Sequence, residues 1–113
     1  MTKSLVSYNN NISRLASYVG FAKKARNIHF GSDKVLASSK KAAIIVSRDI
    51  SDNTLNKLNN HAMKKNVSVV LVDSSIMTEI TQSDKIKVFQ ILDENLEKAI
   101  INGLKLLEDT TLE

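Results

Sequence analysis

Val67-Ser68-Val69-Val70-Leu71-Val72 is an almost uninterrupted apolar run that is rich in β-branched residues. This composition is typical of a β-strand with both faces covered, because a strand with one exposed face alternates apolar and polar residues. A shorter run, Ala43-Ile44-Ile45-Val46, also predicts a buried strand. A strand covered on both faces needs helices on both sides of its sheet. The first run therefore favours an architecture of three layers over one of two.

The segments that flank these runs have the periodicity of amphipathic helices. Residues 12–25 carry apolar side chains at intervals of three and four, with Asn10, Asn11 or Ser13 available as the N-cap. Further helices are expected after the cap-forming Ser51-Asp52-Asn53 and after Asp93. Their apolar stripes contain Leu55, Leu58, Ala62 and Met63 in the earlier helix, and Leu96, Ala99, Ile100, Gly103, Leu104 and Leu107 in the later one.

Shorter elements complete the pattern. Residues 28–30 and 87–92 are expected to form strands. Ser32 is the expected cap of a short helix that ends near residue 39, and Ser74 or Ser75 the cap of another that ends near residue 80. Helices and strands therefore alternate along the whole chain. This alternation predicts an α/β fold, a single-domain three-layer α/β/α sandwich with a small central mixed sheet of about four strands. We expect an ordered core over residues 9–108 with frayed termini.

Composition excludes several functional classes. The chain has 113 residues, of which 42% are hydrophobic and 25% charged, as expected of one globular domain. The absence of cysteine excludes disulfides, thiolate metal sites and a cysteine nucleophile. Aromatic residues make up only 4%, which argues against a base-stacking platform for single-stranded nucleic acid. No signal-like segment and no run of ~20 apolar residues is found, so we expect a cytoplasmic protein that does not enter a membrane.

Positive charge is concentrated in the first half of the chain. The net charge is +4, but residues 1–48 hold nine basic residues and one acidic residue, whereas residues 49–113 hold seven and eleven. A cluster is expected from the close spacing of Lys23, Lys24, Arg26, Lys34, Lys40 and Lys41. Such a cluster is typical of a face that binds a polyanion, although a lysine-rich solvated surface explains the charges equally well.

Signals of catalysis are weak. Of the two histidines, His61 has the setting of a surface residue, and His29 is either a neutral filler or a phosphate contact. No cluster of histidine and carboxylate residues has the spacing of metal ligands. With only three glycines, the chain has no glycine-rich phosphate-binding motif. We expect neither enzymatic activity nor a metal or cofactor.

The most informative motif is Gly31-Ser32-Asp33-Lys34. A glycine directly before a helix lets another backbone approach, and the first N–H groups of the helix are open to phosphate or to base edges. Asp33 disfavours phosphate but can accept hydrogen bonds from the edge of a guanine. The motif is equally typical of an ordinary capped helix start with a conformational glycine.

Two stretches resemble a known family. Gly20-Phe21-Ala22-Lys23-Lys24-Ala25, followed by a short strand and Gly31, resembles the opening of the bacterial YlxQ-like proteins, members of the superfamily of archaeal kink-turn-binding ribosomal proteins. The segment 44–54 resembles the family's apolar strand with the acidic, serine and Asn-Thr residues that follow it. The resemblance extends from about residue 12 to residue 107.

The resemblance implies a three-layer α/β/α sandwich that binds structured, sharply bent RNA in or near the ribosome. It places RNA contacts on Gly31, Ser32, Asp33 and Lys34, and on the loop 81–85, which contains Lys85. Kink-turn binders usually carry Asn and Glu where this chain has Asp33 and Lys34. Aspartate only accepts hydrogen bonds and lysine cannot accept one, so readout of the bases is expected to be changed or lost while phosphate contacts persist.

We therefore expect a monomeric, ribosomal-protein-like RNA-binding protein. RNA contacts are expected from Gly31, Ser32, Asp33 and Lys34, with phosphate neutralisation by Lys23, Lys24, Arg26, Lys40, Lys41 and Lys85. The alternative is a ribosome-associated protein-interaction module that has lost specific RNA readout and docks through its acidic half or through the helix that contains Leu104 and Leu107. An enzyme acting on a phosphorylated substrate would require a pocket with a perturbed titratable group, for which no residue is evident.

Overall fold

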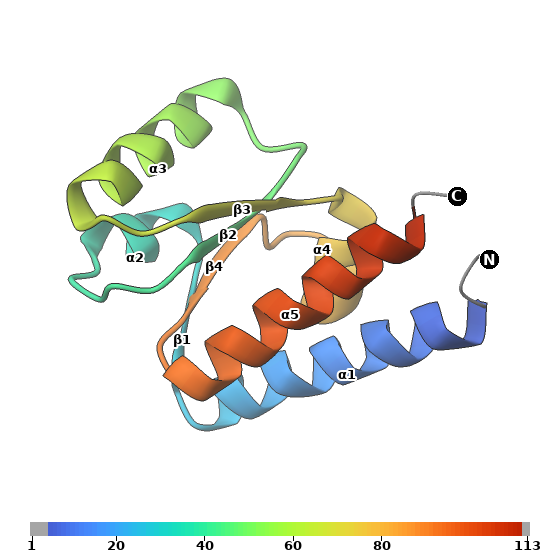
Figure 1. The fold of residues 1–113 in the computed structure, drawn as a ribbon. Helices are drawn as coiled ribbons and strands as arrows, with labels where there is room; N and C mark the ends of the chain where they lie inside the picture. The colour runs from blue at the N-terminus through green and yellow to red at the C-terminus, as the bar shows by residue number, and fades with distance from the viewer. Residues whose placement is uncertain (1–4, 112–113) are drawn as a thin grey trace.

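The expected alternation of helices and strands is confirmed. The computed structural model describes the backbone of residues 5–111 and the side chains of residues 8–107. Its elements (Figure 1) are α1 (Leu5–Lys24), β1 (Ile28–Phe30), α2 (Ser32–Ala37), β2 (Ile44–Ser47), α3 (Asp52–Lys65), β3 (Val69–Val72), α4 (Ser74–Thr81), β4 (Val88–Ile91) and α5 (Glu94–Thr111). Both terminal helices extend beyond the core expected over residues 9–108. The rest of the termini, residues 1–4 and 112–113, lies outside the described part of the chain.

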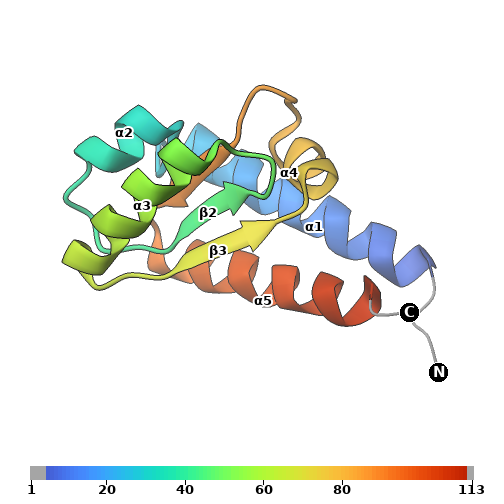
Figure 2. The ribbon, with the colours of Figure 1, turned by 90° about the horizontal axis from the view of Figure 1, so that it is seen from above.

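The four strands form one mixed sheet in the order β1-β4-β2-β3. β2 and β3 are parallel, whereas β4 is antiparallel to both β1 and β2. Figure 2 shows β3 at the outer edge beside β2. Helices α2 and α3 cover one face of the sheet, and α1, α4 and α5 cover the other (Figure 1). The structure is thus the expected α/β/α sandwich.

The sheet separates two hydrophobic cores. The larger core joins α1, α4 and α5 to the sheet through residues such as Leu15, Phe89 and Ile100, which are almost fully buried. The smaller core packs Val35 of α2 and Leu58 of α3 against the opposite face. Apolar burial on both faces is the main stabilising contribution, and it fixes the layers relative to one another.

The prediction that residues 67–72 form a doubly covered strand is wrong. β3 contains only the last four of these residues, lies at the sheet edge, and leaves Leu71 36% exposed. The doubly covered strands are β2 and β4, in which every residue is buried, including Ser47 and Gln90. Hydrophobic content identified the strands, but position within the sheet depends on long-range pairing.

The predicted helix starts are confirmed only for the two helices that have a side-chain cap. Ser51 Oγ accepts a hydrogen bond from the N–H of Thr54 at 3.2 Å, and Asp93 Oδ1 one from the N–H of Leu96 at 2.9 Å. The caps expected at Ser32 and at Ser74 or Ser75 are wrong. Gly31 precedes the first of these helices and Asp73 precedes the second, and no side-chain hydrogen bond caps either helix. Asn10, Asn11 and Ser13 lie inside α1, which begins at Leu5, and α2 ends at Ala37 rather than near residue 39.

Helices α1 and α5 cross closely at Gly103. A β-carbon built on Gly103 would lie 2.6 Å from Cδ2 and 3.1 Å from Cγ of Leu15, whose side chain is 1% exposed. Gly103 therefore allows the helices to approach without displacing a core leucine. Leu104 and Leu107 are also buried in this layer. Their side chains are part of the core, so docking by this helix in the alternative protein-interaction hypothesis would have to use its other residues.

The two helical glycines provide a matched pair of substitutions. G103A should destabilise the fold by about 1–3 kcal/mol, less the gain in helix propensity, because Leu15 has to repack. G20A should stabilise it by roughly 0.5–1 kcal/mol, because no other described atom outside its own helix lies within 4 Å of the new β-carbon. Urea unfolding of both variants measures the two effects. Effects of the same sign would contradict the close approach at Gly103.

Candidate functional site

Three loop segments meet at one corner of the sheet. The N–H of Gly31 donates to the carbonyl oxygen of Val88 at 2.8 Å, and the N–H of Ser47 donates to the carbonyl oxygen of Lys87 at 2.8 Å. The loop between α4 and β4 is thereby held between the start of α2 and the end of β2. We refer to residues 31–34, 47–49 and 82–87 together as the Gly31 corner. It contains five of the expected site residues: Gly31, the first three residues of α2, and Lys85 from the loop.

Gly31 has a backbone conformation that favours glycine. Its φ of 92° and ψ of 150° lie in a region that residues with a side chain rarely adopt. No described atom lies within 4 Å of the position that a β-carbon would occupy, so the space in front of Gly31 is open. The following three N–H groups, of Ser32, Asp33 and Lys34, donate to no described residue. Because α2 has only six residues, these groups provide donors but little helix dipole.

Asp49 fixes the loop that carries Lys85. Its carboxylate accepts hydrogen bonds from the hydroxyl of the buried Ser47 and from Nζ of Lys87 at 2.9 Å. The Ser47 hydrogen bond, followed by that of Lys87, lowers the pKa of Asp49 below its ordinary value of 3.8. The network links the end of β2 to the segment that leads into β4, so the two sides of the corner hold a fixed spacing.

Positive charge at the corner is largely balanced. The corner holds four cationic and three carboxylate side chains, for a formal charge of +1. Lys87 is paired with Asp49, and Arg48 Nε lies 3.3 Å from Asp73, just outside the corner. Lys34 and Lys85 form no ion pair with any described residue. These two exposed lysines are therefore the cations that a polyanion meets without first breaking an ion pair.

The remaining basic residues expected at the site lie elsewhere. Arg26 and the two lysines that end α1 come just before β1, whose first residue, Ile28, pairs with the last residue of β4. Gly31 follows the other end of β1. The loop with Lys40 and Lys41 precedes β2 and is held by the Gln90 amide, which donates to the carbonyl oxygens of Lys40 at 3.4 Å and Ala42 at 2.9 Å. The expected single cluster is thus divided between opposite ends of the sheet, with Lys23, Lys24, Arg26, Lys40 and Lys41 at the end away from Gly31.

Sequence reasoning did not single out Asp49 and Lys87. They lie 38 positions apart, and only the pairing of β4 with β2 brings them together. A local signal existed for Asp49 alone, which follows a buried strand. His29 is the middle residue of β1, and its Nδ1 is buried without a hydrogen-bond partner among the described residues.

No group of three or more histidine or carboxylate side chains among the described residues is arranged to hold a metal ion. None of the described helices combines the length and the apolar character needed to cross a membrane. The arrangement offers hydrogen-bond donors, acceptors and cations on a surface, which is the chemistry of binding.

Comparison with solved structures identifies the same fold in two other proteins. A protein of unknown function from Bacillus halodurans C is 18% identical with a TM-score of 0.69, and the match covers 80% of this chain and 96% of that one. The 15.5kD RNA binding protein of Giardia lamblia is 16% identical with a TM-score of 0.58, over 88% and 90% of the two chains. No family model and no curated protein matches the sequence. At these identities the likeness shows the fold.

The Asp49 network has a testable pH dependence. Its lowered pKa means that Asp49 stabilises the folded state above the unfolded pKa of about 3.9, and that this contribution disappears as the pH falls through the folded value. An NMR titration of the carboxyl carbon should give a pKa below 3.8, and K87A should raise it. An unchanged pKa in K87A would show that Lys87 does not contact Asp49 in solution.

Proposed function

We propose that this protein binds structured RNA and that the Gly31 corner is the docking site. The observation that carries the proposal is the meeting of the α2 start with the α4–β4 loop, in a fold shared with an RNA-binding protein. The corner carries three N–H groups and two lysines, Lys34 and Lys85, that have no hydrogen-bond or ion-pair partner among the described residues. RNA requires both kinds of group, since its phosphates accept hydrogen bonds and carry charge.

Phosphates are contacted first by Lys34 and Lys85. Lys87 and Arg48 would have to exchange carboxylate partners for phosphate, so they contribute less binding free energy. α2 runs from the Gly31 corner to the loop that bears Lys40 and Lys41. An RNA segment that lies along α2 therefore meets Lys34 near one end and Lys40 near the other. Longer RNA is needed to engage both groups of cations.

Ser32 and Asp33 are the residues proposed to approach bases or ribose. The Ser32 hydroxyl donates and accepts hydrogen bonds, whereas the Asp33 carboxylate only accepts them. An acceptor-only group fits the donor edge of guanine or a ribose 2′-hydroxyl, and it repels phosphate. The pair therefore favours a bent RNA in which a base edge or ribose, rather than the backbone, faces Asp33.

The biological setting that fits is the one implied by the YlxQ-like resemblance. We propose a cytoplasmic, ribosome-associated protein that recognises a kink-turn or a similarly bent RNA. The resemblance is carried by residues 12–31 and 44–54, of which Gly31 and residues 47–49 belong to the Gly31 corner, whereas residues 20–25 lie at the other end of β1. A ribosome-associated protein partner is compatible with RNA binding at the Gly31 corner, because the opposite edge of the sheet is separate from the corner.

The experiment compares two RNAs over a series of salt concentrations. Binding of a kink-turn RNA and of a plain duplex of equal length is measured with the full chain. We expect tighter binding to the kink-turn RNA. Equal and steeply salt-dependent binding would reduce the site to a non-specific basic surface, and absence of binding to both RNAs would contradict the proposal.

Substitutions locate the contacts. K34A and K85A should each weaken binding and lower the slope of log K against log salt by about 0.7–0.9, as expected for the loss of one phosphate contact. K64A is the matched control, because Lys64 is an exposed lysine near the far end of α3, roughly 20 Å along that helix from its start. An equal effect of K64A would mean that only overall charge matters.

A further inference from the structure

The outer edge of β3 is an open strand edge. β3 pairs with β2 alone, through hydrogen bonds that include Ile44 N–H to the Ser68 carbonyl oxygen at 2.9 Å and Arg48 N–H to the Val72 carbonyl oxygen at 2.8 Å. Backbone groups alternate in direction along a strand, so those of Val69 and Leu71 point away from β2. No described residue pairs with them. The strand carries neither a charge nor a proline that would block a further strand.

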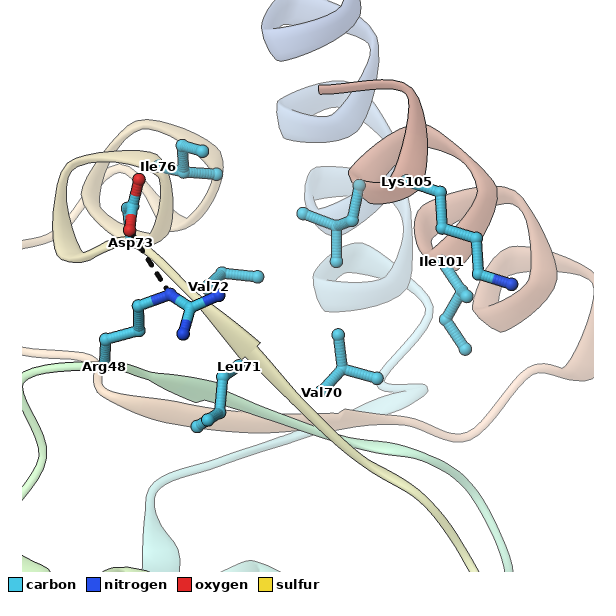
Figure 3. Close-up of a pocket in the computed structure, with 9 residues that line it drawn as sticks. Arg48, Val70, Leu71, Val72, Asp73, Ile76, Ile101 and Lys105 are labelled. Atoms are coloured by element: carbon cyan, nitrogen blue, oxygen red, sulfur yellow. Dashed lines mark ion pairs between the residues drawn. The ribbon is translucent and has the colours of Figure 1, made fainter. Parts of the chain in front are cut away.

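An apolar groove runs beside this edge. A cavity of about 180 Å³ lies between β3, α4 and α5, and Figure 3 shows Val70 and Ile101 facing each other across it. A second hollow of about 320 Å³ continues it toward Val67 and shares Val70, Ile101 and Lys105 with it. Small-molecule sites usually measure ~300–1,000 Å³. The first cavity is smaller than this range and suits one or two aliphatic side chains, and its continuation into the second hollow gives the groove the length for a longer ligand.

The rim of the groove is positively charged. Lys105 and Lys41 line it, and neither forms an ion pair with a described residue. Each of the two acidic residues along the groove has an ion-pair or hydrogen-bond partner. Asp73 pairs with Arg48 (Figure 3), and Glu97 Oε2 accepts a hydrogen bond from the N–H of Ala43 at 2.5 Å. The charged residues of the lining are three cations and two carboxylates, for a formal charge of +1, and its floor is apolar. A ligand along the groove therefore meets Lys105 and Lys41 outside any ion pair, together with the Glu97 carboxylate.

We propose that the β3 edge and this groove bind an extended acidic peptide segment of a partner protein. The peptide adds to the sheet as a strand beside β3, through the outward backbone groups of Val69 and Leu71. Alternate aliphatic side chains enter the groove, and carboxylates reach Lys105 and Lys41. β3 and β1 are opposite edges of the sheet, so this surface is centred away from the start of α2 where RNA is proposed to dock, although Arg48 and Lys41 border both surfaces.

The probe is a blocked heptapeptide of alternating glutamate and valine, and its counterpart with lysine in place of glutamate is the charge control. NMR titration of the isotope-labelled full chain should shift the amides of Val69 and Leu71 with the glutamate peptide, and about tenfold less binding is expected with the lysine peptide. Shifts confined to Lys23, Lys24 and Arg26, or equal binding of both peptides, would overturn the proposal.

Two variants separate charge from strand addition. K105E should weaken binding of the glutamate peptide by about tenfold, whereas K57E, an exposed lysine on the opposite face, should leave it unchanged. L71P removes one outward N–H while the bonds to β2 remain, as edge strands tolerate. It should abolish binding, and L71A should retain it. If L71P does not fold, the comparison of peptide binding by K105E and K57E tests the proposal by itself. Equal losses in K105E and K57E would overturn the proposal.

Sedimentation velocity tests whether a second copy of the chain, rather than a peptide, occupies the β3 edge. The proposal predicts a monomer at all concentrations in the absence of peptide. A concentration-dependent dimer that L71P abolishes would assign the edge to self-association and overturn the peptide proposal. RNA binding by L71P should equal that of the unaltered chain, because the start of α2 lies at the other edge.

Discussion

The insertion of β4 between β1 and β2 is the constraint on which the rest of the structure depends. β4 is the last strand in the sequence, yet it pairs antiparallel with the first two, and its Phe89 and Gln90 are fully buried. This pairing closes both hydrophobic cores. It also brings the α4–β4 loop against Gly31 and places Lys87 beside Asp49. The candidate site is therefore a consequence of the sheet order.

The two edges of the sheet present different chemistry. Around β1 and α2 the surface offers open N–H groups, exposed lysines and a glycine with unobstructed space before it. Along β3 it offers an open strand edge and an apolar groove. Polar, charged ligands fit the first surface and an extended peptide fits the second. The two proposed binding surfaces are thus centred on opposite edges of one sheet, with the hydrophobic cores between them.

Local patterns in the sequence predict the elements and the layers, because periodicity records which side of each element is buried. Ser51 and Asp93 mark helix starts because their side chains accept hydrogen bonds from backbone N–H groups. Local sequence patterns do not indicate the order of the strands in the sheet. For that reason the sequence predicts coverage on both faces for residues 67–72, whereas the doubly covered strands are β2 and β4.

The same limit applies to the site. Gly31 and its positive φ are predictable from a short motif, whereas the ion pair of Asp49 with Lys87 requires knowledge of which strands are neighbours. Proximity in sequence grouped Lys23, Lys24 and Arg26 with Lys34. A strand of three residues between them carries the chain from one end of the sheet to the other. Residues that are close in sequence therefore lie at opposite ends of the sheet when an extended strand, rather than a loop, connects them.

The most direct measurement is a titration of the isotope-labelled protein with a kink-turn RNA, followed residue by residue through its amide NMR signals. If RNA docks at the Gly31 corner, the largest changes occur in residues 31–34 and 82–87, with smaller changes at Lys40 and Lys41. Changes confined to β3 and Lys105, or to Lys23, Lys24 and Arg26 alone, would contradict the assignment of the RNA site to that corner.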